Sequence, residues 1–111
     1  MHSFKRRIYN SLAEMAADLV WPLRHRAQLR RALRGGLVSP QFRERLMMAV
    51  TAVNECRYCA YYHARESERV GLANGEIRAL LAGDLAHAPE DELPALLYAQ
   101  HYAEQNGRPD P

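Results

Sequence analysis

Apolar residues recur at helical spacing along this chain, and no segment alternates between apolar and polar residues as a half-buried strand would. The first apolar stripe predicts a helix over residues 8–20, which ends at Trp21-Pro22 because proline disfavours helical backbone at the residue before it. A shorter, basic helix follows and stops at Gly35-Gly36. The N-terminal third is therefore predicted to be helical.

A pair of helices is predicted in the middle of the chain. Ser39-Pro40 is a start signal, since serine is a good N-cap and proline suits the first helical position. A short break at Asn54-Glu55 leads into a second helix, which runs from Cys56 to about Val70 and is capped by Gly71. We expect the two helices to pack as a hairpin. The inward apolar face of the first helix consists of Phe42, Leu46, Ala49, Val50 and Val53.

Two further helices complete the pattern. Asn74-Gly75-Glu76 starts a short helix that Gly83 ends, and the last helix runs from about Glu90 to Ala103. The fold class predicted for the whole chain is therefore all-α.

With 111 residues, the chain is expected to form a single domain, 1–111, with an adequate but thin core. Within it we distinguish a basic N-terminal helical segment, 1–36, from a motif-bearing core, 37–111. The net charge is +2, from 15 Lys and Arg against 13 Asp and Glu, which is too small to indicate a nucleic-acid partner. The bases are nevertheless clustered in the first third, where they could form a basic face: Lys5, Arg6, Arg7, Arg24, Arg26, Arg30, Arg31 and Arg34.

The sequence gives no sign of a membrane segment or a secretory leader. The longest apolar run, Leu46 to Val53, is far shorter than the ~20 residues needed to span a bilayer. The positive start is followed by a stretch that Glu14 and Asp18 interrupt, unlike a signal peptide. We therefore expect a cytoplasmic protein without a membrane partner. Thiols are kept reduced in that compartment, so a close cysteine pair should be catalytic or metal-binding rather than a structural cross-link.

The residues that carry chemistry are concentrated in the predicted hairpin. Glu44 lies twelve positions before Cys56, Cys59 follows three positions later, and His63 four positions after that. Helical positions three and four apart share one face, so both thiols and the imidazole would project together. The hairpin could also bring His63 back toward Glu44. Since the chain has only two cysteines, the pair either carries out redox chemistry or holds a metal.

This array resembles the AhpD-like branch of the carboxymuconolactone decarboxylase superfamily, whose motif places a glutamate, a C-x-x-C pair and a histidine at this spacing. The resemblance rests on Glu44, Cys56, Cys59 and His63. The chain departs from the best-known AhpD pattern at Tyr58, where that pattern has a second histidine. The fold that the resemblance implies is an AhpD-like helical domain with the cysteine pair on a helix hairpin.

The activity that the resemblance implies is that of an alkylhydroperoxidase-like antioxidant enzyme, a thiol-disulfide oxidoreductase that reduces hydroperoxides or other disulfides. In this cycle Cys59 is the reactive thiol, Cys56 is its resolving partner, and Glu44 and His63 relay protons. The redox-active Cys56–Cys59 disulfide is the working group, and no added cofactor or metal is implied.

The resemblance also implies partners. Members of the family typically receive electrons from a dithiol, often on a lipoyl-bearing protein, and assemble as trimers or larger rings such as hexamers, so we expect a homo-oligomer. The resemblance extends weakly to the C-terminal end, whereas residues 1–36 show no family signal. Because the chain stops after a turn-like sequence, 107–111, that usually leads into further helix, we expect either a short member or a chain truncated at its C-terminus.

Other functions fit the same residues. Cys56, Cys59 and His63 could bind zinc together with Glu44, although structural zinc sites usually draw their cysteines from turns. The basic N-terminal third is compatible with a non-catalytic oligomeric scaffold or binding module. A carboxymuconolactone decarboxylase-like enzyme is a further alternative, although such decarboxylases generally lack the cysteine pair. Glu44 taken alone is also compatible with an ordinary solvated helix position.

Overall fold

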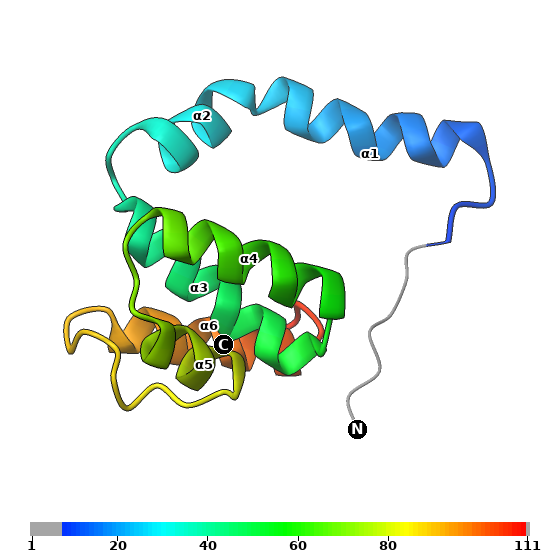
Figure 1. Cartoon of the computed structure of the whole chain (residues 1–111). Helices are drawn as coiled ribbons and strands as arrows, with labels where there is room; N and C mark the ends of the chain where they lie inside the picture. Colours follow the sequence, from blue (N-terminus) through cyan, green and yellow to red (C-terminus); the bar gives the residue numbers. More distant parts are fainter. Residues whose placement is uncertain (1–7, 111) are drawn as a thin grey trace. The chain divides into compact units, whose positions relative to one another are not determined.

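A computed structural model describes residues 8–110 of the chain. The described part contains six helices and no strand, which confirms the all-α prediction (Figure 1). The chain divides into two compact units, whose described parts are residues 8–39 and 40–110. The expectation that the whole chain is one domain stays a prediction.

The N-terminal unit consists of α1 (Leu12–Arg24) and α2 (Arg26–Arg34), which together bury none of their residues. The start of α1 is set by Ser11, whose hydroxyl accepts a hydrogen bond from the Glu14 backbone N–H at 3.2 Å. The Asn10 backbone N–H donates in turn to the Glu14 carboxylate at 3.0 Å. These contacts satisfy N–H groups that a helix start leaves without a partner, so the helix begins at residue 12 rather than at residue 8.

The predicted break at Trp21-Pro22 is wrong, because α1 continues through Pro22 to Arg24. Proline removes one backbone donor, but here it lies in the last turn, where His25 holds the helix end. The His25 backbone N–H donates to the Trp21 carbonyl at 3.0 Å, and the two rings stack with centroids 4.4 Å apart. The predicted stop of the second helix is confirmed, since Gly35 is the C-cap of α2.

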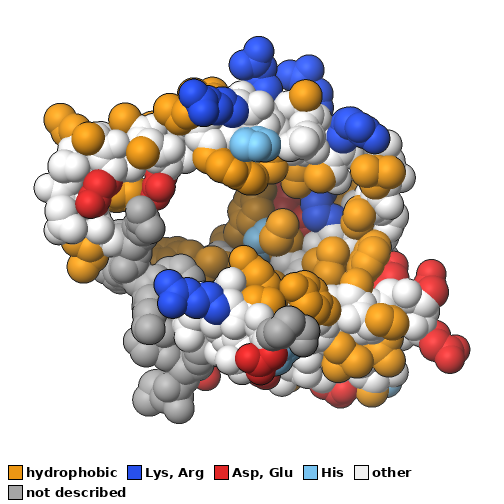
Figure 2. Space-filling model, turned by 180° about the vertical axis from the view of Figure 1, so that it is seen from behind, with side chains coloured by type: hydrophobic (Ala, Val, Ile, Leu, Met, Phe, Trp, Pro, Cys, Tyr) orange, Lys and Arg blue, Asp and Glu red, His pale blue; other side chains and the backbone are white. Residues whose placement is uncertain are grey.

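Basic side chains are prominent on this unit, and Figure 2 shows them grouped mainly near α2. All of the predicted bases that the structure describes here are exposed: Arg24, Arg26, Arg30, Arg31 and Arg34. The remaining three, Lys5, Arg6 and Arg7, lie outside the described residues.

The C-terminal unit is built around α3 (Pro40–Asn54), which packs against α4 (Arg57–Arg69), α5 (Asn74–Leu81) and α6 (Leu93–Glu104) (Figure 1). A cluster of buried side chains holds α3, α4 and α5 together. Its members are Met48, Leu72, Ile77 and Leu80, with Ala64, Val70, Leu81 and Leu85 packed around them. The long helix α3 therefore contacts all three other helices of this unit.

Glycine and a capping turn define the end of α4 as predicted. The backbone of Gly71 has φ +93°, a conformation that costs other residues energy, and the Leu72 N–H donates to the Ser67 carbonyl at 3.0 Å. The hairpin prediction is therefore confirmed at both helices. The last helix begins later than predicted, at Leu93 rather than near Glu90.

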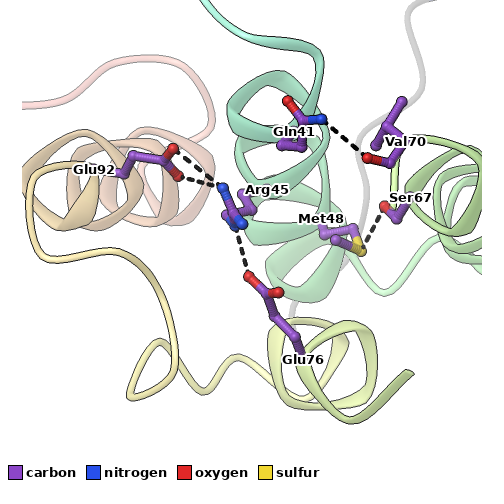
Figure 3. A network of polar contacts seen from close by, with 7 residues as sticks. All are labelled: Gln41, Arg45, Met48, Ser67, Val70, Glu76 and Glu92. Atoms are coloured by element: carbon purple, nitrogen blue, oxygen red, sulfur yellow. Dashed lines mark hydrogen bonds and ion pairs between the residues drawn. The ribbon is translucent and has the colours of Figure 1, made fainter. Parts of the chain in front are cut away.

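Polar contacts fix the orientation of α3 against its neighbours (Figure 3). The Arg45 guanidinium donates to the Glu76 carboxylate at 2.6 Å and to both Glu92 oxygens at 3.1 Å. Burial alone would lower the pKa of Arg45, but the hydrogen bond to Glu76 and the attraction of both carboxylates raise it. On another side of α3, the Gln41 amide donates to the Val70 carbonyl at 3.0 Å. Because these contacts hold α3 on different sides, they fix its position along its axis and its rotation about that axis.

Within residues 8–110, no helix is both long enough and apolar enough to cross a membrane.

Candidate functional site

A disulfide between Cys56 and Cys59 lies at the start of α4, with the two Cα atoms 5.2 Å apart. Cys56 is the N-cap of this helix, and its sulfur accepts a hydrogen bond from the Cys59 backbone N–H at 3.2 Å. Both cysteines are half-buried. A helix start directs unpaired N–H groups at its cap, so this position favours negative charge on sulfur when the disulfide opens.

The turn that positions Cys56 has an unusual backbone. Glu55 joins α3 to α4 with φ +53°, a left-handed conformation that is uncommon for a residue other than glycine. Its N–H donates to the Thr51 carbonyl at 2.9 Å, which closes the last turn of α3. This one residue reverses the chain between the helices and places Cys56 at the new helix start.

The predicted approach of His63 to Glu44 is confirmed. His63 Nδ1 lies 2.8 Å from Glu44 Oε2, although the two residues are 19 positions apart. Glu44 is only 4% exposed, so the interpretation of it as a solvated helix residue is wrong. An ionised carboxylate can only accept hydrogen bonds, so this pairing requires the proton on Nδ1, and in the neutral imidazole Nε2 is then the acceptor. The carboxylate thereby fixes both the tautomer and the orientation of the imidazole.

The sequence that forms this site matches a known protein family. The model described as the carboxymuconolactone decarboxylase family matches residues 10–105. The chain belongs to this family. No curated protein and no solved structure matches the chain. The match extends through α1 and α2, so the expectation that residues 1–36 carry no family signal is wrong for residues 10–36.

In this member of the carboxymuconolactone decarboxylase family, α4 carries exposed tyrosines next to the site residues in the sequence. Tyr58, which stands between the two cysteines in sequence, is 90% exposed. The ring of Tyr62 meets that of His63 edge-on, with centroids 5.1 Å apart. Tyr58 is therefore open to solvent, whereas His63 is supported on one side by an aromatic ring and on another by Glu44.

The zinc alternative has no assembled ligand set in the described part of this family member. Among residues 8–110, no group of three or more His, Cys, Asp or Glu side chains is placed to hold a metal ion. The two sulfur atoms that a zinc site would use are bonded to each other. The Glu44 carboxylate is hydrogen-bonded to His63, and it lies 3.6 Å from the Arg43 Nε atom.

A surface pocket of about 380 Å³ adjoins the disulfide between the end of α3, the start of α4 and the end of α5. Cys56 and Arg57 line it, together with small or aliphatic residues that include Ala52, Ala60 and Leu81. Cys59 is not among the described residues that line it. This pocket could not be predicted from the sequence, because alanines at these positions look like ordinary helix residues until three helix ends meet.

Proposed function

We propose that this protein is a thiol-disulfide oxidoreductase of the AhpD-like branch, which reduces hydroperoxides with the Cys56 and Cys59 thiols. The single observation that carries the proposal is the pairing of Glu44 with His63 on the hairpin that also bears the disulfide. A buried carboxylate that orients an imidazole is the arrangement by which a general base is prepared for a nearby nucleophile. An inert cysteine pair does not require that arrangement.

The oxidative half of the cycle begins with the reduced protein. His63 Nε2 accepts the proton of the Cys59 thiol, while Glu44 stabilises the positive imidazole that results. The Cys59 thiolate attacks the terminal oxygen of the hydroperoxide, which breaks the O–O bond and releases an alkoxide that takes up a proton as alcohol. Cys59 is then a sulfenic acid, oxidised by two electrons.

Resolution and reduction complete the cycle. Cys56 attacks the Cys59 sulfur, water leaves, and the Cys56–Cys59 disulfide forms. A dithiol reductant then returns two electrons by thiol-disulfide exchange and is itself oxidised to a disulfide. By family resemblance, that dithiol belongs to a lipoyl-bearing protein. A cytoplasmic location fits a cycle whose resting thiols must be kept reduced.

The deciding experiment is an intact-mass measurement on the metal-free, fully reduced protein before and after one equivalent of cumene hydroperoxide. The expected product has lost two hydrogens and both alkylation sites. A variant with Cys59 replaced by serine is the control and should form no intramolecular disulfide. Two thiols that still react with the alkylating agent after peroxide would remove the peroxidase proposal and favour disulfide exchange, zinc binding or a scaffold role.

Homo-oligomer formation is part of the same proposal. Large apolar side chains are exposed on both units, among them Leu12 at 83%, Trp21 at 58% and Leu97 at 52%. Contact with further copies of the chain would cover such residues, as in the trimers or hexamers typical of the family. Light scattering after size-exclusion chromatography should give a multiple of 12.7 kDa, and the monomer mass would contradict this part of the proposal.

A further inference from the structure

The pocket beside the disulfide is lined by one of the two cysteines and not by the other. Cys56 forms part of its wall, and Cys59 does not, although the two residues are bonded. The structure contains the closed disulfide, which is the oxidised state of the proposed cycle. The pocket is therefore present in the form of the protein that a reductant must meet.

We propose that this pocket is the entry site of the reductant, a dithiol on an alkyl stem, and that its first thiolate attacks Cys56 rather than Cys59. The inference rests on the proposed function and extends it by naming the attacked sulfur and the kind of molecule that approaches it. Access is one of the factors that decide which sulfur of a disulfide is attacked. Both cysteines are half-buried, and of the two only Cys56 lines the pocket.

The second factor is the leaving group, and the site provides for departure of Cys59. Attack on Cys56 forms a mixed disulfide with the reductant, breaks the Cys56–Cys59 bond and expels Cys59 as a thiolate. His63 lies one helical turn after Cys59 and can return a proton to it. The cap hydrogen bond from the Cys59 N–H favours negative charge on the Cys56 sulfur rather than on the Cys59 sulfur. A proton transferred to the Cys59 thiolate removes its negative charge, so Cys59 can leave without that hydrogen bond.

The second thiol of the reductant completes the exchange. It attacks the reductant sulfur of the mixed disulfide, so Cys56 leaves as a thiol and the reductant becomes a cyclic disulfide. Two electrons and two protons have then moved from the dithiol to the protein. One monothiol molecule can complete only the first step, so the intermediate can be trapped when thiols are blocked early.

The wall composition indicates the occupant. Ala52, Ala60 and Leu81 present aliphatic surface that suits an alkyl stem, and a volume of about 380 Å³ suits a chain of small-molecule size. Arg57 and Glu55 also line the pocket and add one charge of each sign, which favours a neutral stem over a charged one. A stem of this kind can belong to a free dithiol or to one attached to a protein, and the chemistry at Cys56 is the same.

The attacked sulfur can be identified by trapping on the wild-type protein with its disulfide formed. We would add 8-mercaptooctanamide, a monothiol on an alkyl stem, block thiols early with N-ethylmaleimide, and map the peptides. The expected product carries the octanamide adduct on Cys56 and maleimide on Cys59. An adduct mainly on Cys59, equal amounts on both, or no adduct at all would overturn the inference.

The pocket itself is tested by filling it. Ala60→Leu should slow reduction of the disulfide by dihydrolipoamide by about tenfold or more, which is the usual range when a pocket loses its fit to an apolar ligand. Thermal melts should show that Ala60→Leu is folded, so that slower reduction reflects the filled pocket. Ala86→Leu is the matched control, because Ala86 is exposed and does not line the pocket. Equal reduction rates in Ala60→Leu and wild type would contradict the assignment.

These measurements separate the inference from the proposed function. Trapping and reduction start from a disulfide formed with diamide and do not involve a hydroperoxide. An adduct on Cys56 in a protein that peroxide fails to oxidise would retain the entry site and remove the peroxidase activity. Oxidation by peroxide together with an adduct on Cys59 would do the reverse.

Discussion

The pairing of Glu44 with His63 makes a quantitative prediction for the peroxide step. In Glu44→Gln the amide keeps the shape of the side chain and can still accept the Nδ1 hydrogen bond of 2.8 Å, but the negative charge is lost. Hydrogen bonds to charged groups contribute about 1.5–3 kcal/mol, compared with ~1 kcal/mol between neutral groups. Because the Glu44 side chain is only 5% exposed, water cannot replace the missing charge.

This loss falls on the state in which the imidazole has taken the proton of Cys59. At about 1.4 kcal/mol for each factor of ten, losing roughly 1–2 kcal/mol lowers the rate about 5- to 30-fold. The assay is single-turnover oxidation of the reduced protein by cumene hydroperoxide, quenched with N-ethylmaleimide and read by intact mass. Reduction of the disulfide by dithiothreitol should still go to completion in the variant.

A matched control separates the charge at this site from charge in general. Glu66→Gln removes a carboxylate from α4 whose partner is the exposed Arg69, at 3.0 Å, and should leave the oxidation rate unchanged. The melting temperature of Glu44→Gln should be recorded in parallel, so that a folding defect is not taken for a slower reaction. Oxidation of a folded Glu44→Gln protein at the wild-type rate would refute the role of Glu44 as the partner of a general base.

Three further predictions follow from the contacts above. Arg45→Met should lower the free energy of unfolding by about 3 kcal/mol, measured by urea denaturation, because both glutamates of its network would lose their partner; a loss below ~1 kcal/mol would contradict this. His63→Ala should move the pH dependence of Cys59 alkylation by iodoacetamide toward that of an ordinary thiol near ~8.5, and an unchanged profile would argue against contact between the two groups. Gly71→Ala should cost about 1 kcal/mol because its φ is +93°, whereas Gly75→Ala, in ordinary helical backbone, should be neutral or stabilising; thermal melts that rank the two variants in the opposite order would refute the backbone argument.

Most of the fold could be predicted from local signals. The stops at Gly35-Gly36 and Gly71 were predictable, because Gly36 and Gly71 adopt the positive φ that reverses the chain after a helix. The start and the end of α1 were not, since Ser11 and Glu14 form a cap inside a stretch whose apolar residues already have helical spacing, and His25 holds the turn after Pro22. Local propensity was outweighed in both places by specific hydrogen bonds.

The inward face of α3 shows why periodicity alone has limits. The predicted face included Phe42, Leu46 and Val50, which are half-buried, whereas Glu44 and Met48 are fully buried. A helix packed against three others is covered on most of its circumference, so its buried positions no longer form a single apolar stripe. The burial of Glu44 could be inferred only from its spacing to the cysteine pair.

Helix α3 carries both a residue of the proposed active site and a residue of the ion-pair network that holds the helix in place. Glu44 faces α4 and His63, whereas the next residue, Arg45, is held by Glu76 and by Glu92, which lies just before α6. Adjacent helical residues point about 100° apart, so the Arg45 network cannot shift along or around α3 without moving the Glu44 carboxylate as well. A 2.8 Å hydrogen bond tolerates only a few tenths of an ångström of such movement before it weakens. Loosening the Arg45 network should therefore slow the peroxide step even in molecules that remain folded, although Arg45 touches neither sulfur nor imidazole.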